Sequence, residues 1–196
     1  MVPLAALGQE HPSGQWYANA DVGAAFEQQL RIRRSGELID FHNGIRGDLA
    51  VGYQYNSWIA GELTSGAIWN SVQKIGGVPV TSFSTTMDLY QMPILADVVL
   101  STPTWHGFRP YLGGGFGGVA ALLNLKRPLG DISDTDFEFA YQAFAGLNYQ
   151  VCRRAEIGVG YKYLATESHS WIQNGVTLDT AGTGTHSVTA SVTIKF

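Results

Sequence analysis

Histidine and serine are the residues of this chain whose types first suggest catalysis. His169-Ser170 and His186-Ser187 each place an imidazole next to a hydroxyl in sequence, and a serine that gives its proton to histidine becomes a nucleophile. The other histidines, His11, His42 and His106, are scattered, and no two of the five have the spacing of metal ligands. These residues leave hydrolysis as a hypothesis and predict no metal site.

A glycine run and a single cysteine are the next candidates. Gly113-x-Gly115-x-x-Gly118 has the spacing of a dinucleotide fingerprint, but that fingerprint needs a following helix, and here the glycines fall inside an expected strand. Such glycines let a strand bend or a bulky neighbour lie flat. Cys152 is the only cysteine, which excludes an intrachain disulfide and a cysteine-rich zinc site. We therefore predict no cofactor and no catalytic residue.

The composition excludes several classes of protein. Charged residues make up 14% of the 196 residues, against roughly 25% in an average soluble domain. A coiled coil would carry more Glu, Lys and Leu, and a disordered chain would carry fewer aromatic residues than the 12% present. A formal net charge of −4 gives no indication of a nucleic-acid partner. No stretch approaches the roughly 18 consecutive apolar residues of a transmembrane helix.

Apolar residues alternate with polar ones along most of the chain. The alternation is clearest over 185–196, where five of the six even-numbered residues are apolar and all the odd-numbered ones are polar. A period of two predicts a strand with one apolar face, and no segment has a helical period. The expected strands are 15–27, 45–56, 58–69, 86–101, 108–123, 137–151, 155–166 and 185–196.

Strand length and loop asymmetry predict that these strands cross a membrane. They run to roughly 11–15 residues, longer than the 5–6 usual in soluble proteins and enough for a tilted strand to span a bilayer. The connections alternate between long and short, as in outer-membrane barrels. The long ones are 27–43, 70–85, 124–136 and 167–184.

Aromatic residues mark both ends of the expected strands and predict two girdles at the membrane interfaces. Trp16, Tyr55, Trp58, Trp105, Tyr149 and Phe196 lie at the short-turn ends, and Phe26, Trp69, Phe137 and Tyr163 lie near the long loops. We therefore predict an all-β, eight-stranded antiparallel up-and-down transmembrane β-barrel over 15–196. It has short periplasmic turns, long extracellular loops and a periplasmic extension over 1–14.

A soluble eight-stranded barrel of the lipocalin kind is the main alternative, because periodicity alone does not distinguish the inside from the outside. Its outer face would carry many Lys and Glu residues. Here the polar face consists mostly of Gly, Ala, Ser, Thr, Asn and Gln. That composition, the strand lengths and the terminal Phe196 favour the membrane.

The last strand looks like the C-terminal signal by which the barrel assembly machinery recognises bacterial outer-membrane proteins. The signal positions are Val188, Ala190, Val192, Ile194 and Phe196. Segments 92–100, 109–117 and 139–149 also resemble small barrels of the outer-membrane-protein-A and opacity type. The resemblance implies the outer membrane of a Gram-negative bacterium, with lipopolysaccharide and the assembly machinery as partners. It is informative about fold rather than role, because this fold hosts anchors, adhesins, enzymes and pores.

Lipid A deacylases are also eight-stranded barrels, and their Ser–His–Glu site invites comparison with the two His-Ser pairs. That family has His and Ser two residues apart and then Asn, whereas here they are adjacent and no such Asn follows. Resemblance to the palmitoyltransferase barrel is no better, because its N-terminal amphipathic helix is absent here. A lipid A-modifying enzyme is the third hypothesis for the function.

The polar positions of the expected strands hold a set of charged and amide side chains that would face the lumen. They are Asp21, Arg46, Asp48, Glu62, Asp97, Arg109, Gln142, Glu156, Lys162 and Lys195. An eight-stranded barrel is just wide enough for side chains to fill it, and buried charges need partners. We expect a salt-bridge and hydrogen-bond network that plugs the lumen, with a narrow conduit or proton relay as the alternative.

Arg31, Arg33 and Arg34 form a basic cluster in the first long loop. Arginine suits the phosphates of lipopolysaccharide because its planar fork donates two parallel hydrogen bonds. A solvated loop balanced by neighbouring carboxylates is the alternative interpretation.

The expected role is structural or interactive rather than enzymatic. The barrel would display segments such as 27–43, 70–85 and 167–184, or pack against a membrane-protein partner through its wall. A narrow small-solute pore is the second hypothesis.

Overall fold

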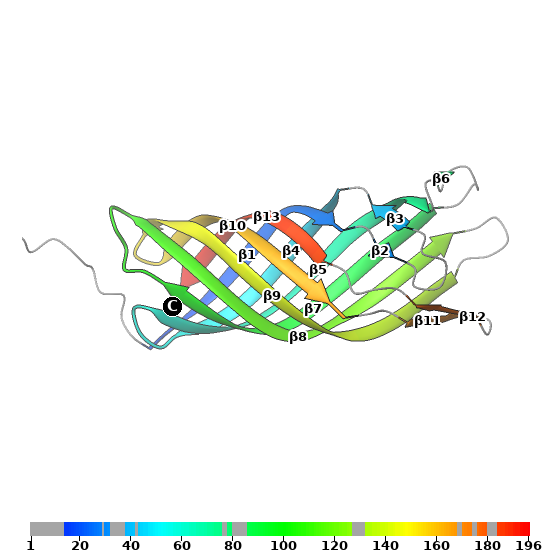
Figure 1. Ribbon diagram of the computed structural model, residues 1–196. Helices are drawn as coiled ribbons and strands as arrows, with labels where there is room; N and C mark the ends of the chain where they lie inside the picture. The colour runs from blue at the N-terminus through cyan, green and yellow to red at the C-terminus, as the bar shows by residue number, and fades with distance from the viewer. Residues whose placement is uncertain are drawn as a thin grey trace, which may run out of the picture.

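Eight long antiparallel strands close into a barrel in the computed structural model (Figure 1). It describes residues 14–28, 30–31, 38–41, 43–75, 78–79, 86–126, 132–167, 170–173, 176–179 and 184–196. The barrel strands are β1 (Gln15–Glu27), β4 (Gly44–Gln54), β5 (Ile59–Ile75), β7 (Thr86–Ser101), β8 (Phe108–Lys126), β9 (Ile132–Cys152), β10 (Ala155–Thr166) and β13 (Gly184–Lys195). Each pairs with the next in this order, and β13 pairs with β1. The predicted fold class is confirmed.

The first and last strands meet at the rim that carries the short turns. The backbone N–H of Phe196 donates to the carbonyl of Trp16 over 3.0 Å. The turns 55–58, 102–107 and 153–154 lie at this end, on the left in Figure 1. Residues 1–13, most of the predicted periplasmic extension, lie outside the described part of the chain. Within that part there is no helix that could span a membrane.

The strands on one side of the barrel run further past the opposite rim than the sequence predicts. β5 continues to Ile75, β8 continues to Lys126 and β9 begins at Ile132, so segments predicted as the loops 70–85 and 124–136 are partly strand. The alternation criterion missed these extensions because a strand that leaves the bilayer no longer needs one apolar face.

Short strands also lie within the predicted loops. They are β2 (Leu30–Arg31), β3 (Leu38–Phe41), β6 (Val78–Pro79), β11 (Ser170–Gln173) and β12 (Val176–Asp179). β3 and β6 pair with the projecting part of β5, while β11 and β12 form a separate hairpin. The wall formed by β5, β7, β8 and β9 therefore stands taller than the wall formed by β10, β13 and β1 (Figure 1).

The apolar face of every barrel strand points outward and the polar face points into the lumen. Leu49 is 68% exposed, whereas Arg46, three residues before it on the same strand, is fully buried. The aromatic residues predicted for the two girdles include Trp16, Trp58 and Trp105 at one rim and Phe137 at the other, all exposed on the outside. A soluble barrel would have the opposite arrangement, so the lipocalin-like alternative is wrong.

The glycine run in β8 lies within the strand and accommodates large neighbours. A Cβ atom on Gly113 would lie 2.4 Å from the ring of Phe144, and one on Gly118 would lie 2.2 Å from the ring of Phe137. The rings therefore occupy the space beside these glycines, and the described residues after the run, up to Lys126, continue as strand.

Candidate functional site in the barrel lumen

A charged cluster occupies the middle of the lumen. Lys162 Nζ bonds Asp21 Oδ2 over 2.6 Å and Asp48 Oδ2 over 2.7 Å. The Nε of Arg46 donates to the same Asp48 oxygen over 2.8 Å. These side chains come from β1, β4 and β10 and are almost fully buried. Each buried charge therefore has a partner of opposite sign, which buried ions require.

Gln142 connects this cluster to the opposite side of the barrel. Its Oε1 accepts from Arg46 Nη2 over 3.1 Å, and its Nε2 donates to the two oxygens of Asp97 over 2.8 and 2.9 Å. Thr64 donates to Asp97 as well, over 2.7 Å. β4, which carries Arg46, and β9, which carries Gln142, face each other across the closed ring of strands. The Arg46–Gln142–Asp97 chain of hydrogen bonds therefore crosses the lumen.

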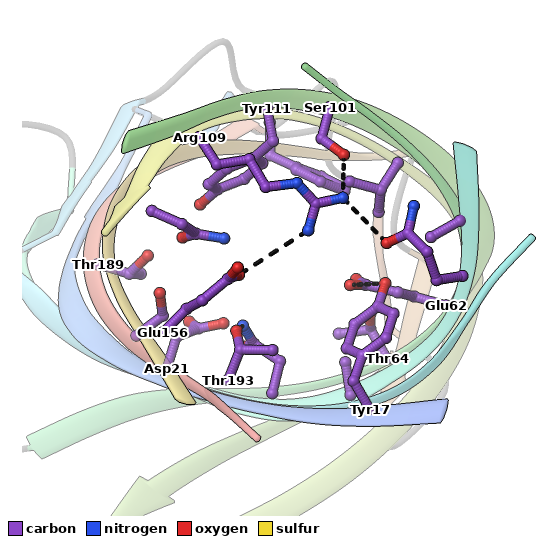
Figure 2. Close-up of a pocket in the computed structure, with 18 of the residues that line it drawn as sticks. Tyr17, Asp21, Glu62, Thr64, Ser101, Arg109, Tyr111, Glu156, Thr189 and Thr193 are labelled. Carbon is purple, nitrogen blue, oxygen red and sulfur yellow. Dashed lines mark hydrogen bonds and ion pairs between the residues drawn. The ribbon is translucent and has the colours of Figure 1, made fainter. Parts of the chain in front are cut away.

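A second polar cluster lies toward the periplasmic rim. Glu156 forms an ion pair with Lys195. Figure 2 shows its second ion pair, with Arg109, whose Nη1 lies 3.9 Å from Glu156 Oε2. Arg109 Nη2 also donates to Gln54 over 3.0 Å and to Ser101 over 2.5 Å. This guanidinium joins β4, β7, β8 and β10 in one network.

Tyr17 and Glu62 complete the polar lumen. The Tyr17 hydroxyl donates to the Glu62 carboxylate over 2.7 Å. The structure thus places all ten charged and amide side chains predicted for the lumen inside the barrel.

Two glycines provide room for the central carboxylates. A Cβ atom on Gly66 would lie 2.0 Å from Asp48 Oδ1, and one on Gly115 would lie 2.1 Å from Asp97 Oδ1. Both distances are far below van der Waals contact, so only glycine fits at these positions without displacing a carboxylate.

A small cavity of about 60 Å³ lies between the two polar clusters; we call it the chamber. Asp21, Arg109 and Asn148 are among the residues that line it. Each has a buried polar atom without a protein partner: Asp21 Oδ1, Arg109 Nε and Asn148 Oδ1. Such a volume holds about four to six water molecules, which can satisfy these atoms.

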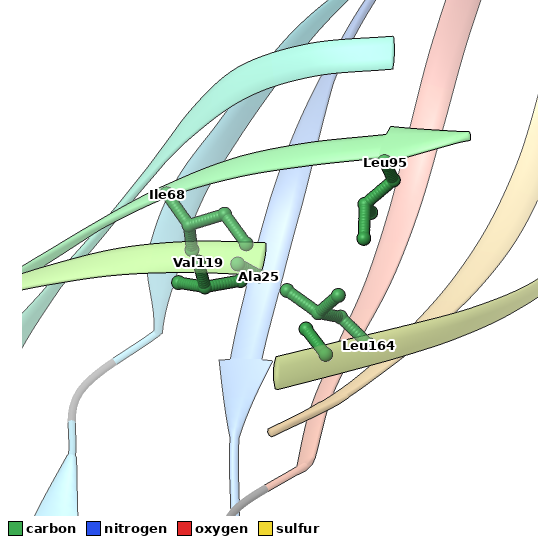
Figure 3. Packing of buried hydrophobic residues seen from close by; sticks show 6 residues of the cluster. Ala25, Ile68, Leu95, Val119 and Leu164 are labelled. Atoms are coloured by element: carbon green, nitrogen blue, oxygen red, sulfur yellow. The ribbon is translucent and has the colours of Figure 1, made fainter. Parts of the chain in front are cut away.

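An apolar layer, which the alternation of the strands does not predict, lies on the extracellular side of the central cluster. It consists of Ala25, Ile68, Leu95, Val119, Ala140 and Leu164, each at most 1% exposed. Figure 3 shows that these side chains extend from several strands into one shared space. A signal was present, because Ile68, Leu95 and Leu164 occur at polar positions of their strands.

The remaining predicted sites lie elsewhere. The assembly-signal positions Val188, Ala190, Val192, Ile194 and Phe196 all face outward. Arg31 belongs to β2, and Arg33 and Arg34 lie outside the described residues, as do His11, His42 and His169. Cys152 is an exposed free thiol at the end of β9, next to the turn 153–154. His106 packs edge-on against Trp105 in the turn 102–107.

The one His-Ser pair that the structure describes is divided between the two faces of β13. His186 Nδ1 shares a hydrogen bond with the Tyr161 hydroxyl over 2.5 Å, and its Nε2 lies 2.8 Å from Gln28 Nε2, all on the outer face. The Ser187 side chain is buried in the lumen. Imidazole and hydroxyl therefore cannot act together in a deacylase-like site.

A closed ladder of strands with an apolar outer face and a polar lumen defines an integral β-barrel protein of the bacterial outer membrane. The sequence agrees: over residues 1–196 it matches the family model for the outer membrane protein beta-barrel domain. The chain belongs to this family.

Solved structures of other outer-membrane barrels share the fold. Neisserial surface protein A matches with 17% identity and a TM-score of 0.61, over 92% of this chain and 97% of that one. OprG from Pseudomonas aeruginosa matches with 13% identity and a TM-score of 0.63, over 96% and 98%. Ail, the attachment invasion locus protein of Yersinia pestis, in complex with the heparin analogue sucrose octasulfate, matches with 17% identity and a TM-score of 0.53, over 93% and 100%. No curated protein matches the sequence.

Proposed function

We propose that this protein is a non-catalytic outer-membrane barrel whose lumen is plugged and whose role is structural, surface display or partner binding. The Arg46–Gln142–Asp97 connection across the lumen carries the proposal. A hydrogen-bonded bridge between opposite walls leaves no wide aqueous path, because an eight-stranded barrel has little room beyond its own side chains.

Single-channel recording in planar bilayers tests the closed lumen. We expect the purified, folded protein to produce no stable open channels at moderate voltage. Stable openings in the wild-type protein would overturn the proposal and favour the second candidate, a narrow small-solute pore. The chamber is the observation that supports this second candidate.

Surface display is supported by the tall wall of β5, β7, β8 and β9, which carries strand pairing beyond the opposite rim. Strands that extend past the membrane hold loops at a distance from the lipid, where a partner can reach them. A native pull-down in mild detergent, comparing the full chain with a variant that replaces 170–179 by a short Gly-Ser linker, tests this part. Retention of every partner by the variant would exclude that segment as the binding element.

Lipopolysaccharide is the proposed partner of Arg31, Arg33 and Arg34. Replacement of all three by Gln is expected to reduce lipopolysaccharide retained during purification, because each arginine can donate bidentate hydrogen bonds to phosphate. Unchanged retention would favour the solvated-loop interpretation.

Two further assignments belong to the same proposal. Deletion of Phe196 is expected to slow insertion by the assembly machinery, measured as the folded fraction on unheated gels.

Expression of the chain is expected to leave the mass spectrum of lipid A unchanged, and a shift would revive the lipid A-modifying hypothesis.

A further inference from the structure

The lumen alternates between polar and apolar levels that are two residues apart along the strands. Two residues toward the periplasm from the apolar layer, the same six strands carry Gly23, Gly66, Asp97, Gly117, Gln142 and Lys162. Two residues in the opposite direction, five of the strands carry Glu27, Asn70, Pro93, Glu138 and Thr166. Because side chains at i and i+2 point to the same face of a strand, these sets form consecutive levels of the lumen.

The level outside the apolar layer is polar again. Glu27 accepts hydrogen bonds from Thr185 over 2.6 Å and from Asn70 over 3.2 Å. Asn70 Oδ1 and Thr166 Oγ1 are buried and have no protein partner. A polar group left without a hydrogen bond costs about 1–3 kcal/mol, so water is expected at this level too.

The apolar layer thus separates two polar compartments, the chamber with its ionic network on one side and the outer polar level on the other. We propose that this layer is the gate of the lumen: it is the barrier to water and small cations, and opening it would turn the barrel into a narrow cation-conducting channel. Apolar constrictions close pores by dewetting, without any need for a rigid block. The inference rests on the closed lumen of the proposed function: the Arg46–Gln142–Asp97 bridge narrows the lumen, and the apolar layer is the part that stops water and ions.

The preference for cations follows from the charges that line the path. Among the described lumen-facing side chains there are seven carboxylates, Asp21, Glu27, Asp48, Glu62, Asp97, Glu138 and Glu156. The cations among them are Arg46, Arg109, Lys162 and Lys195. A lumen with excess negative charge attracts cations and excludes anions.

The test replaces apolar side chains of the gate by small polar ones. In planar bilayers, the double variant Leu95→Ser/Leu164→Ser is expected to show cation-selective openings at least about ten times as frequent as the wild type, because a hydroxyl-lined constriction stays wet. Leu49→Ser/Leu63→Ser is the matched control, since both leucines face lipid. Asp97→Asn is the second control, because it weakens the ionic network and leaves the gate intact.

Thiol accessibility tests the same gate without channel recording. In a Cys152→Ser background, Ser191→Cys places a single thiol in the wall of the chamber. A membrane-impermeant thiol reagent added from the extracellular side should leave this thiol unmodified, and the Leu95→Ser/Leu164→Ser changes should make it reactive. If the double variant does not fold, Leu164→Asn alone is used with the thiol readout.

The outcomes separate the two proposals. A wild-type protein that conducts overturns the closed lumen itself. A second outcome is that neither the wild type nor the folded gate variant conducts, and that the chamber thiol of the gate variant stays unmodified. This outcome overturns the gate but agrees with the closed lumen. Openings in Asp97→Asn without openings in the gate variant would assign the closure to the ionic network instead.

Discussion

Two neighbouring levels of the lumen are filled in opposite ways. The ionic level holds Asp97 and Gln142, and the apolar level, which is the apolar layer described above, holds Leu95 and Ala140. In the ionic level, three of the six strands carry glycine, at positions 23, 66 and 117, and long polar side chains from the other strands use the space. In the apolar level none of these six strands carries glycine, and two alanines lie among four larger apolar residues. Charged side chains need both room and partners, whereas apolar side chains need only close packing.

The two levels should respond differently to truncation, and the ionic level should respond more strongly. Asp97→Ala removes the acceptor for Gln142 and Thr64 and leaves both of these buried donors without that partner. We expect a loss of about 3–5 kcal/mol in the free energy of unfolding, because breaking a buried ionic network leaves uncompensated polar groups. Urea titration in lipid vesicles, followed by tryptophan fluorescence, measures it. Glu167→Ala, at an exposed site, is the control, and an equal loss there would contradict the comparison.

Truncation in the apolar level should cost less but remain clear. Leu95→Ala is expected to lower the free energy of unfolding by about 3 kcal/mol, since it leaves a cavity in a fully buried cluster. The matched control is Leu63→Ala, where lipid fills the space that the side chain leaves. The same urea titration applies. If both leucines cost the same, the apolar level is not close-packed.

Adding one carbon tests the room that glycine gives to the ionic level. Gly66→Ala should destabilise the barrel by about 2 kcal/mol, because the new Cβ would lie 2.0 Å from Asp48 Oδ1 and 2.6 Å from the carbonyl of Gly47. Gly47→Ala is the control, since its Cβ would lie 3.7 Å from its nearest neighbour, the carbonyl oxygen of Asp21. Urea midpoints that shift equally in both variants would show that backbone entropy, and not space, decides the effect.

The smallest effect is expected for a single hydrogen bond at the edge of the network. Tyr17→Phe removes the donor to Glu62 and should cost about 1.5 kcal/mol, because a hydrogen bond to a charged group contributes more than a neutral one. Tyr141→Phe, on the outer face, should cost much less. If Tyr17→Phe leaves the free energy of unfolding unchanged, water replaces the hydroxyl in the chamber.

The strands could be predicted from the sequence, because lipid imposes a strict period of two. Their inside–outside sense could be predicted from the scarcity of Lys and Glu on the polar face and from the strand lengths. Leu49 has an odd number and Arg46 an even one, so they lie on opposite faces of β4. In the structure Leu49 is exposed and Arg46 is buried, as the alternation predicts. The strand ends beyond the bilayer, such as 70–75 and 124–126, could not be predicted in the same way. Water on both faces removes the pattern there.

The composition of the lumen could be predicted only in part. The charged residues at polar positions were visible, but the pairing of Arg46 with Gln142 depends on how the register of every strand adds up around the barrel. The apolar layer was hidden because each strand contributes only one member to it. Ile68 or Leu164 alone is an ordinary exception to alternation, and only closure of the barrel brings the exceptions together.

The seam between β1 and β13 has a consequence for biogenesis. Asn19 donates to Thr193 across this seam, a contact between residues 174 positions apart. Until the last strand has been synthesised and paired, every shorter chain is an open sheet with two rows of unpaired backbone groups, which a bilayer does not tolerate. Insertion of this barrel therefore cannot proceed strand by strand into bare lipid. It requires an environment that protects both edges until residues from opposite ends of the chain meet.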